Sequence, residues 1–340
     1  MEHLRAQFHQ ELDDEGDIII AGENFTRHDI LNVLAPEPYR IAFNEWLENR
    51  KIKLLDKAVD ILSHYDNAAR FEQLGLAFRG GSMVPCVGAG LSVASGFPPW
   101  TKFLYQVCDE SHVVTADLSA LLAGGEYEEA AELLYNDLGA ALFNENVQST
   151  FASEKKPLGV VNFLPVLFPN TSILTTNFDP LIETVYKGDG FEGFDRVQSG
   201  KVLSEVCRQM TEGSRLLVKM HGDCRQVADR VLLKSEYEAA YTDASAVKLF
   251  FNQVMFGRSL LFLGCSLSTD RTIKTMKDLV VEYGSENLPR HYAFLELKAV
   301  DDRIARKKDL AAANIFPIWY DEDDHDESLE ALFLKLMQVK

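Results

Sequence analysis

The pattern of apolar and polar positions divides this chain of 340 residues into two parts. From about Arg79 onward, short runs rich in β-branched and aromatic residues alternate with segments in which apolar residues recur at helical spacing. This alternation is typical of an α/β fold, a parallel sheet with helices on both faces. The predicted strands are 82–87, 171–177, 215–222, 259–265, 291–297 and 314–320. The predicted helices between them include 126–143, 243–257 and 269–284.

Residues 1–76 show a different pattern. One possible short strand, 16–22 (GDIIIAG), precedes helical material at 39–50 and 53–65. We therefore predict a mainly helical N-terminal extension, residues 1–76, packed on a main domain of residues 77–340. Trp46 and its aromatic neighbours in the extension are either part of a core or an oligomer contact.

Four of the predicted strands end in polar or glycine-containing motifs, where open α/β sheets bind ligands. These motifs are GAG at 88–90, TTNFD at 175–179, MHGD at 220–223 and GCSLSTD at 264–270. A strand followed by GAG and a helix offers backbone N–H groups and a positive helix end to a pyrophosphate. The next glycine is Gly96 and no strand-end acid follows at the usual distance, so the spacing departs from GxGxxG and disfavours an ordinary dehydrogenase.

In this order, GAGLSVASGFP, TTNFD, HGD and LGCSLS resemble the signatures of the sirtuin (silent information regulator) superfamily, from about Gly80 to Tyr320. The resemblance implies a Rossmann-like NAD-binding fold. It assigns Asn177 and His221 to catalysis beside the nicotinamide ribose. It also assigns seven residues to NAD binding: Gly88, Ala89, Gly90, Ser92, Asp179, Gly264 and Ser266.

Two departures separate the chain from sirtuin deacetylases. SGFP is followed by Pro99, Trp100 and Thr101 instead of Asp-Phe-Arg, so that Trp100 replaces at most the aromatic cover. The region 224–259 contains one cysteine, so four thiolate ligands cannot be assembled there, and we expect no zinc-ribbon module and no metal.

The chain is more similar to a bacterial sirtuin-like branch that hydrolyses NAD in antiphage defence, in which 232–241 (LLKSEYEAAY) and 260–270 (LLFLGCSLSTD) have counterparts. This resemblance implies that NAD is the substrate and is cleaved to nicotinamide and ADP-ribose. It also implies a partner such as a HerA-type ATPase.

Cleavage of the nicotinamide–ribose bond passes through an oxocarbenium-like state, which an Asn that positions water and a His that holds ribose hydroxyls would stabilise. Two alternative functions remain open: a module that senses NAD or ADP-ribose without turnover, and an NAD-dependent deacylase or ADP-ribosyl transferase. Structural roles also remain open. His221 could be a buried strand-end histidine, Asn177 and Asp179 a turn with a helix cap at Asp179, and Ser266 a plain turn residue.

Composition narrows the setting. A net charge of -18 repels nucleic-acid backbones, so we expect no direct binding of nucleic acid. The sequence contains no run of about eighteen uncharged apolar residues, so it predicts no membrane span. The N-terminus lacks a signal-peptide pattern and the five cysteines are isolated, so we expect a cytoplasmic protein with reduced thiols. The acidic run 321–327 is interpreted as a solvated loop that favours the start of the last helix, with a metal site as the alternative. Because a sirtuin-like core does not need the extension to form its site, we expect the extension to mediate homo-oligomer formation or partner docking.

Overall fold

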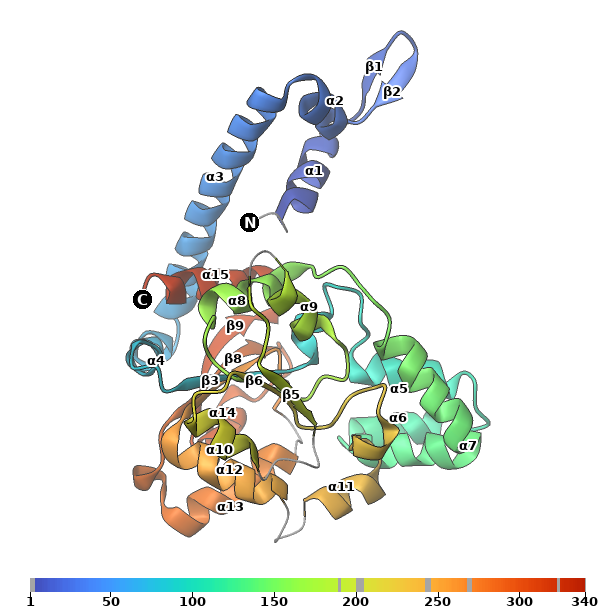
Figure 1. Ribbon diagram of the computed structural model, residues 1–340, viewed down its shortest axis with the longest axis vertical. Coiled ribbons are helices and arrows are strands. Elements are labelled where there is room, and N and C mark those ends of the chain that lie inside the picture. The colour runs from blue at the N-terminus through green and yellow to red at the C-terminus, as the bar shows by residue number, and fades with distance from the viewer. Residues whose placement is uncertain are drawn as a thin grey trace.

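The computed structural model describes residues 4–188, 191–199, 205–241, 246–267, 271–322 and 325–339. Within these ranges, seven parallel strands form one sheet in the order β5-β6-β4-β3-β7-β8-β9 (Figure 1). The strands are β3 (Met83–Val87), β4 (Ile173–Thr175), β5 (Arg196–Ser199), β6 (Leu216–Lys219), β7 (Ser259–Leu263), β8 (His291–Leu297) and β9 (Ile315–Asp321).

Helices cover both faces of the sheet. Successive side chains of a strand point to opposite faces, and since both faces are apolar, each is buried in a separate core. On β3, Met83 and Val87 belong to one core, whereas Val84 and Cys86 belong to the other. The first core is closed by α4 (Asn67–Arg79), α5 (Trp100–Cys108), α6 (Thr115–Ala123), α7 (Tyr127–Phe151), α8 (Leu164–Leu167), α9 (Leu181–Lys187) and α15 (His325–Met337). The second is closed by α10 (Val206–Thr211), α12 (Ala246–Gly257), α13 (Arg271–Tyr283) and α14 (Arg303–Ala311). The predicted α/β, Rossmann-like fold class is confirmed.

All six predicted strands are present, although most begin or end a few residues inside the predicted ranges. The sequence analysis missed β5, which lies at the edge of the sheet and pairs with β6 alone. Its four residues include an exposed Arg196 and an exposed Val197, so it lacks the buried apolar run by which the other strands were recognised. The predicted helices also form, as α7, α12 and α13, although α7 is kinked at Gly139, where φ is 76°. Residues 243–245 and 268–270 of the predicted segments lie outside the described residues.

The N-terminal region is helical, as predicted, and part of it projects from the body (Figure 1). We call residues 5–50 the arm: α1 (Arg5–Asp13), a hairpin of β1 (Ile18–Ile20) and β2 (Glu23–Phe25), α2 (Arg27–Leu34) and the first half of α3 (Pro36–Ser63). Beyond the arm, α3 packs on α15, and at the last residue of the arm the Nε of Arg50 donates to Glu330 Oε1 at 3.2 Å. Both segments of predicted helical material, 39–50 and 53–65, belong to or border one continuous helix, α3. Because α4 runs through the predicted boundary at residue 76, the division into two domains stays a prediction.

The arm has a small aromatic core of its own. Phe8, Tyr39 and Phe43 are buried, and Trp46 packs on Phe8 with ring centroids 5.5 Å apart. The indole N–H of Trp46 donates to Glu11 at 2.6 Å. Trp46 is therefore part of a core within this chain.

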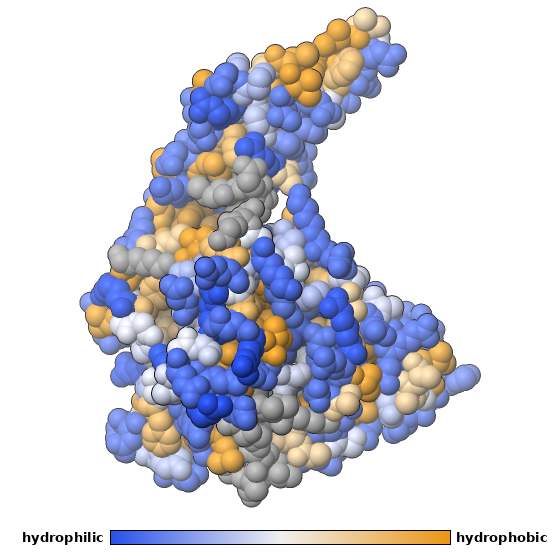
Figure 2. Space-filling model, viewed as in Figure 1, coloured by the Kyte–Doolittle hydropathy of each residue, from blue (hydrophilic) through white to orange (hydrophobic). Residues whose placement is uncertain are grey.

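Apolar side chains gather at the far end of the arm (Figure 2). Ile19 and Val33 are about 70% exposed, and Ile20 and Phe25 more than 40% exposed. Within the described ranges, none of the helices combines the length and the apolar character needed to cross a membrane.

Part of the acidic run 321–327 is used at the start of the last helix. Asp326 and Glu327 lie in the first turn of α15, where negative charge stabilises the positive helix end, as predicted. Asp323 and Asp324 lie outside the described residues.

Candidate functional site

The strand register brings the four predicted motifs to one edge of the sheet. Val87 pairs with Thr175 on one side and with Leu263 on the other, and Thr175 pairs with Lys219. The residues that follow these positions therefore leave the sheet at the same level. This edge also contains the point where the chain order reverses, between β3 and β7, which is the usual ligand site of such sheets.

The glycines of GAG allow two turns to touch. A β-carbon on Gly88 would lie 2.6 Å from the carbonyl oxygen of Gly264, and one on Gly90 would lie 2.9 Å from the same oxygen. Gly264 itself has a φ of 66°, a left-handed conformation that suits glycine. The turn after β7 therefore packs directly against the GAG turn after β3.

The same contact uses N–H groups that were predicted to bind phosphate. The N–H of Gly88 donates to Leu263 O at 2.8 Å, and the N–H of Gly90 donates to Gly264 O at 2.9 Å. The turn then forms a short 3₁₀ helix, η2 (Ala89–Ser92), rather than the start of an α-helix. Phosphate binding by these residues stays a prediction, and any such binding must use groups other than these two N–H groups.

Asn177 is held firmly at the end of β4. Its backbone N–H donates to Thr175 Oγ1 at 3.0 Å, and its side-chain Nδ2 donates to Gly88 O at 3.2 Å and to Ser92 Oγ at 3.1 Å. The side chain thus joins the β4 loop to the GAG turn and is buried. Its amide oxygen has no hydrogen-bond partner among the described residues, so it is the atom that can orient a water molecule or a ligand.

Asp179 makes a structural hydrogen bond one residue before Pro180, which is the N-cap of α9. Its Oδ1 accepts from the N–H of Leu181 at 3.0 Å at the start of α9. Burial raises the pKa of this carboxyl above its usual range, although the hydrogen bonds from Leu181 and from the Ser92 hydroxyl oppose the rise. This hydrogen bond does not remove Asp179 from the edge of the site, because its partner Ser92 also binds Asn177.

Lys219, which the sequence analysis did not single out, locks the β4 loop to the β6 loop. Its Nζ donates to the carbonyl oxygens of Phe178 and Asp179 and to Glu183 and Asp223, at 2.7–3.2 Å, and the residue is 1% exposed. Burial by itself lowers the pKa of Lys219, but the two carboxylates raise it above its usual value. The available signal was position, since Lys219 is the last residue of β6 and stands two residues before His221.

His221 is buried at the end of β6, and two tyrosines of α11 (Lys234–Ala240) and its C-cap contact its ring. Tyr237 Oη lies 3.1 Å from Nδ1 and 3.5 Å from Nε2, and Tyr241 Oη lies 3.4 Å from Nε2. The sequence analysis missed both tyrosines, which lie four residues apart, a spacing that places side chains on one helix face.

The remaining predicted residues lie at the same edge. Ala89 is exposed at the tip of its turn, and the carbonyl of Ser266 accepts from Arg306 at 3.2 Å. Trp100 stacks on Phe103 at 5.1 Å and contacts Phe178 of the β4 loop at 6.0 Å, as an aromatic cover would. No test of their contact with NAD follows from this placement, so the assignments stay predictions.

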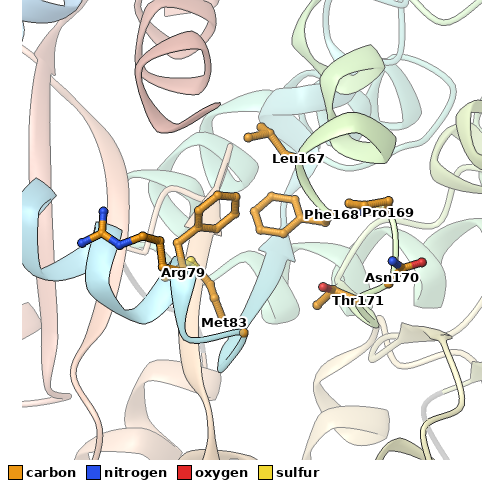
Figure 3. Close-up of a pocket in the computed structure, with 9 residues that line it drawn as sticks. Arg79, Met83, Leu167, Phe168, Pro169, Asn170 and Thr171 are labelled. Carbon is orange, nitrogen blue, oxygen red and sulfur yellow. The ribbon is translucent and has the colours of Figure 1, made fainter. Parts of the chain in front are cut away.

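Two cavities formed by the described residues lie near the sheet, one beside this edge and one at the opposite edge. One of about 250 Å³ is lined by Lys219, Asp223 and residues of β5, next to the His221 loop. Another of about 490 Å³ lies where β3 begins and where the chain enters β4, against the rings of Phe78 and Phe168 (Figure 3). The second cavity is at the amino ends of the strands, away from the predicted motifs.

Thiols and acids give no metal centre in the described part of the chain: no group of three or more His, Cys, Asp or Glu side chains is arranged to hold an ion there. All five cysteines are free thiols. The region between the His221 loop and β7 is occupied by α11 and α12.

Comparison with known proteins agrees with this geometry. Residues 171–318 match the SIR2-like domain family. The chain is 25% identical over 231 residues to the NAD(+) hydrolase ThsA of Cytobacillus dafuensis, covering 68% of this chain and 41% of that protein. It is 24% identical over 236 residues to the NAD(+) hydrolase ThsA of Enterococcus faecium, covering 68% and 46% respectively.

A third relative is the defense-associated sirtuin 2 of Bacillus subtilis, 23% identical over 192 residues, which cover 56% of this chain and 18% of that protein. The predicted resemblance to sirtuin-like proteins, and to those named for NAD hydrolysis and defence, is therefore confirmed. The chain spans less than half the length of these relatives.

Proposed function

We propose that this protein is an NAD glycohydrolase that cleaves NAD to nicotinamide and ADP-ribose as the NAD-depleting effector of a bacterial antiphage defence system. The observation that supports the proposal is that Asn177 and His221 each stand two residues beyond the paired positions Thr175 and Lys219 on neighbouring strands. The relatives named as NAD(+) hydrolases support the same activity.

The chemistry requires little beyond these groups. Nicotinamide leaves as a neutral molecule from a cationic precursor, so no acid is needed for the leaving group. Water then adds to the ribose carbon and releases one proton. In this proposal the amide oxygen of Asn177 orients that water, while the imidazole of His221 holds a ribose hydroxyl and stabilises the developing positive charge.

Separate measurements of turnover and binding test the proposal. We expect Asn177→Ala and His221→Ala each to reduce nicotinamide release about a hundredfold or more, because each removes a positioned group. NAD affinity, measured by calorimetry, should change by less than about threefold, since binding is spread over many other contacts. The matched controls are Asn146→Ala and His112→Ala, which alter the same residue types on the surface.

The outcomes separate the alternatives. Parental turnover in both site variants would refute the assignment. Binding of NAD without nicotinamide release by any assembly of the parent protein would indicate a sensing module. Release that requires an acyl-lysine peptide would indicate a deacylase.

We also propose that the arm joins copies of this chain into a homo-oligomer in the cytoplasm. An isolated two-stranded hairpin is marginally stable in water, and β1 has an open edge. Antiparallel pairing of β1 with a second copy about a two-fold axis would place Ile19 opposite Ile19 and Asp17 opposite Ala21, so no like charges would meet.

Light scattering tests this assembly. Ile19→Lys is expected to reduce the molar mass of the assembly, whereas Val300→Lys, on the body and 92% exposed, should leave it unchanged. An unchanged mass for both would rule out the hairpin contact. Co-purification with a HerA-type ATPase, the partner that we propose from the resemblance, would be measured on the same two variants.

A further inference from the structure

The side chain of Lys219 closes the short β6 loop that carries His221. Its Nζ donates to Asp223 Oδ2 at 2.7 Å, and the N–H of Gly222 donates to the carbonyl oxygen of Lys219 at 3.0 Å. Asp223 also accepts from the N–H of Arg225 at 2.9 Å. Lys219 and Asp223 stand two residues before and two residues after His221, so the ion pair joins the two sides of the loop.

The same ammonium binds the β4 loop that carries Asn177. It donates to the carbonyl oxygens of Phe178 and Asp179 at 3.2 and 3.0 Å, and these two residues directly follow Asn177. The side chain of Asn177 is bonded on its other side to the GAG turn. One nitrogen atom therefore contacts the backbone next to Asn177 and the far end of the loop that carries His221.

This arrangement requires the charge of Lys219 as well as its length. The residue is 1% exposed, and its Nζ also pairs with Glu183 Oε1 of α9 at 3.0 Å. The side chains of Glu183 and Asp223 are 15% and 20% exposed, so water screens the two carboxylates only in part. Without the ammonium the carboxylates would repel each other, and the two carbonyl oxygens would lose their donor. The expected response is that the β6 loop moves away from the β4 loop.

We propose that Lys219 is a positioning residue, which sets the distance between the amide of Asn177 and the imidazole of His221 by binding both loops through one ammonium. This inference rests on the proposed function for the reaction that the two groups perform, whereas the coupling of the loops is a property of the protein alone. A displacement of about 1 Å at a reacting group lowers a rate by up to about a hundredfold, so a residue that acts only through position has a large effect.

Turnover of Lys219→Met, which has a side chain of similar length without the charge, tests the proposal. We expect kcat for nicotinamide release to fall about tenfold or more, because the two groups no longer share one fixed geometry. The dissociation constant of NAD should change by less than about threefold, since binding is spread over many other contacts. A residue needed only for stability would leave kcat per folded molecule unchanged.

The control variant removes a buried partner elsewhere. Glu330→Ala leaves the guanidinium of Arg50 without its carboxylate, in a pair whose side chains are 8% and 12% exposed. This variant also loses stability, but it should keep the parental kcat per folded molecule, because the pair lies between α3 and α15.

Hydrogen exchange of the full-length proteins, followed by mass spectrometry, reports on the loops without any reaction. The N–H groups of Asn177 and Leu181 donate to neighbouring residues of the β4 loop, and that of Gly222 donates within the β6 loop. In Lys219→Met, peptides that cover the two loops should exchange faster than the same peptides in Glu330→Ala, because a local link is lost in addition to global stability.

Asp223→Ala is the second variant, to be used if Lys219→Met does not fold. It opens the β6 loop, while the ammonium keeps Glu183 and the two carbonyl oxygens of the β4 loop as partners. We expect kcat to fall about fivefold, with faster exchange in the β6 loop alone.

Parental kcat per folded molecule in Lys219→Met, or in Asp223→Ala where only that variant folds, would overturn the proposal. Exchange of the loops at the rate seen in Glu330→Ala would overturn it as well. If the loops exchange faster as expected but no assembly of the parent releases nicotinamide, the coupling of the loops by Lys219 stands and the proposed NAD hydrolysis fails. The two failures are thus distinguishable.

Discussion

Replacing Gly90 with alanine tests the contact between the turns after β3 and β7. The added β-carbon would lie 2.9 Å from both the Cα and the carbonyl oxygen of Gly264, whereas ordinary contacts of this kind are 3.4–4 Å. Both neighbours are backbone atoms at the end of a buried strand, so neither can rotate away. One turn must move by about half an ångström or more, and the hydrogen bond from Gly90 N–H to Gly264 O must lengthen.

The expected cost is about 2 kcal/mol, in the range measured for overpacked interiors. At about 2.1 cal/mol/K of unfolding entropy per residue, a chain of this length has roughly 0.7 kcal/mol/K, so the melting temperature should fall by about 3 °C. The matched control is Gly257→Ala, at the end of α12, where a β-carbon meets nothing within 4 Å. That change should be neutral or stabilise by up to about 1 kcal/mol, because alanine restricts the unfolded chain.

Urea denaturation followed by circular dichroism measures both variants. A Gly90→Ala protein as stable as Gly257→Ala would refute the argument that the glycines are required for contact between turns. The same contact affects ligand studies. A larger residue at Gly90, such as valine, would disturb the contact between the turns and weaken NAD binding through loss of structure. Such a variant therefore does not show whether Gly90 binds phosphate.

Two further predictions concern stability. Complete burial lowers the pKa of His291 to about 3, so the folded state keeps this ring neutral while the unfolded chain takes up a proton below pH 6.5. Its contribution is present above pH 6.5 and is lost as the pH falls, by about 2 kcal/mol at pH 5; His291→Asn should show a weaker fall between pH 7 and pH 5 in urea titrations, and an equal fall would contradict the assignment. Glu330→Ala leaves the guanidinium of Arg50 without its buried partner and should lower the free energy of unfolding by about 3 kcal/mol, and adding Arg50→Met should recover part of this loss. Equal losses in the single and double variants would show that the pair does not join α3 to α15.

Local patterns in the sequence were enough to predict the class of fold and every strand of the large sheet except β5. The central strands are short apolar runs bounded by glycine or polar residues, and this information lies within each run, as β8 at 291–297 shows. The sequence also predicted that the strand-end motifs lie at one edge of the sheet, because parallel strands have their carboxyl ends on the same side. The motifs thus predicted which residues would meet before any contact was known.

Only the tertiary structure showed which residues contact one another, because the contacting residues come from distant parts of the chain. The short polar strand β5 forms only because β6 offers it an edge, and the GAG glycines are required by Gly264, more than 170 positions away. Lys219 is a buried cation only because the β4 loop and Asp223 surround it. Likewise, a tyrosine in a helical segment has no visible relation to His221 until α7 holds that helix beside the strand end, since a periodic pattern specifies the face of a helix but not what the face will meet.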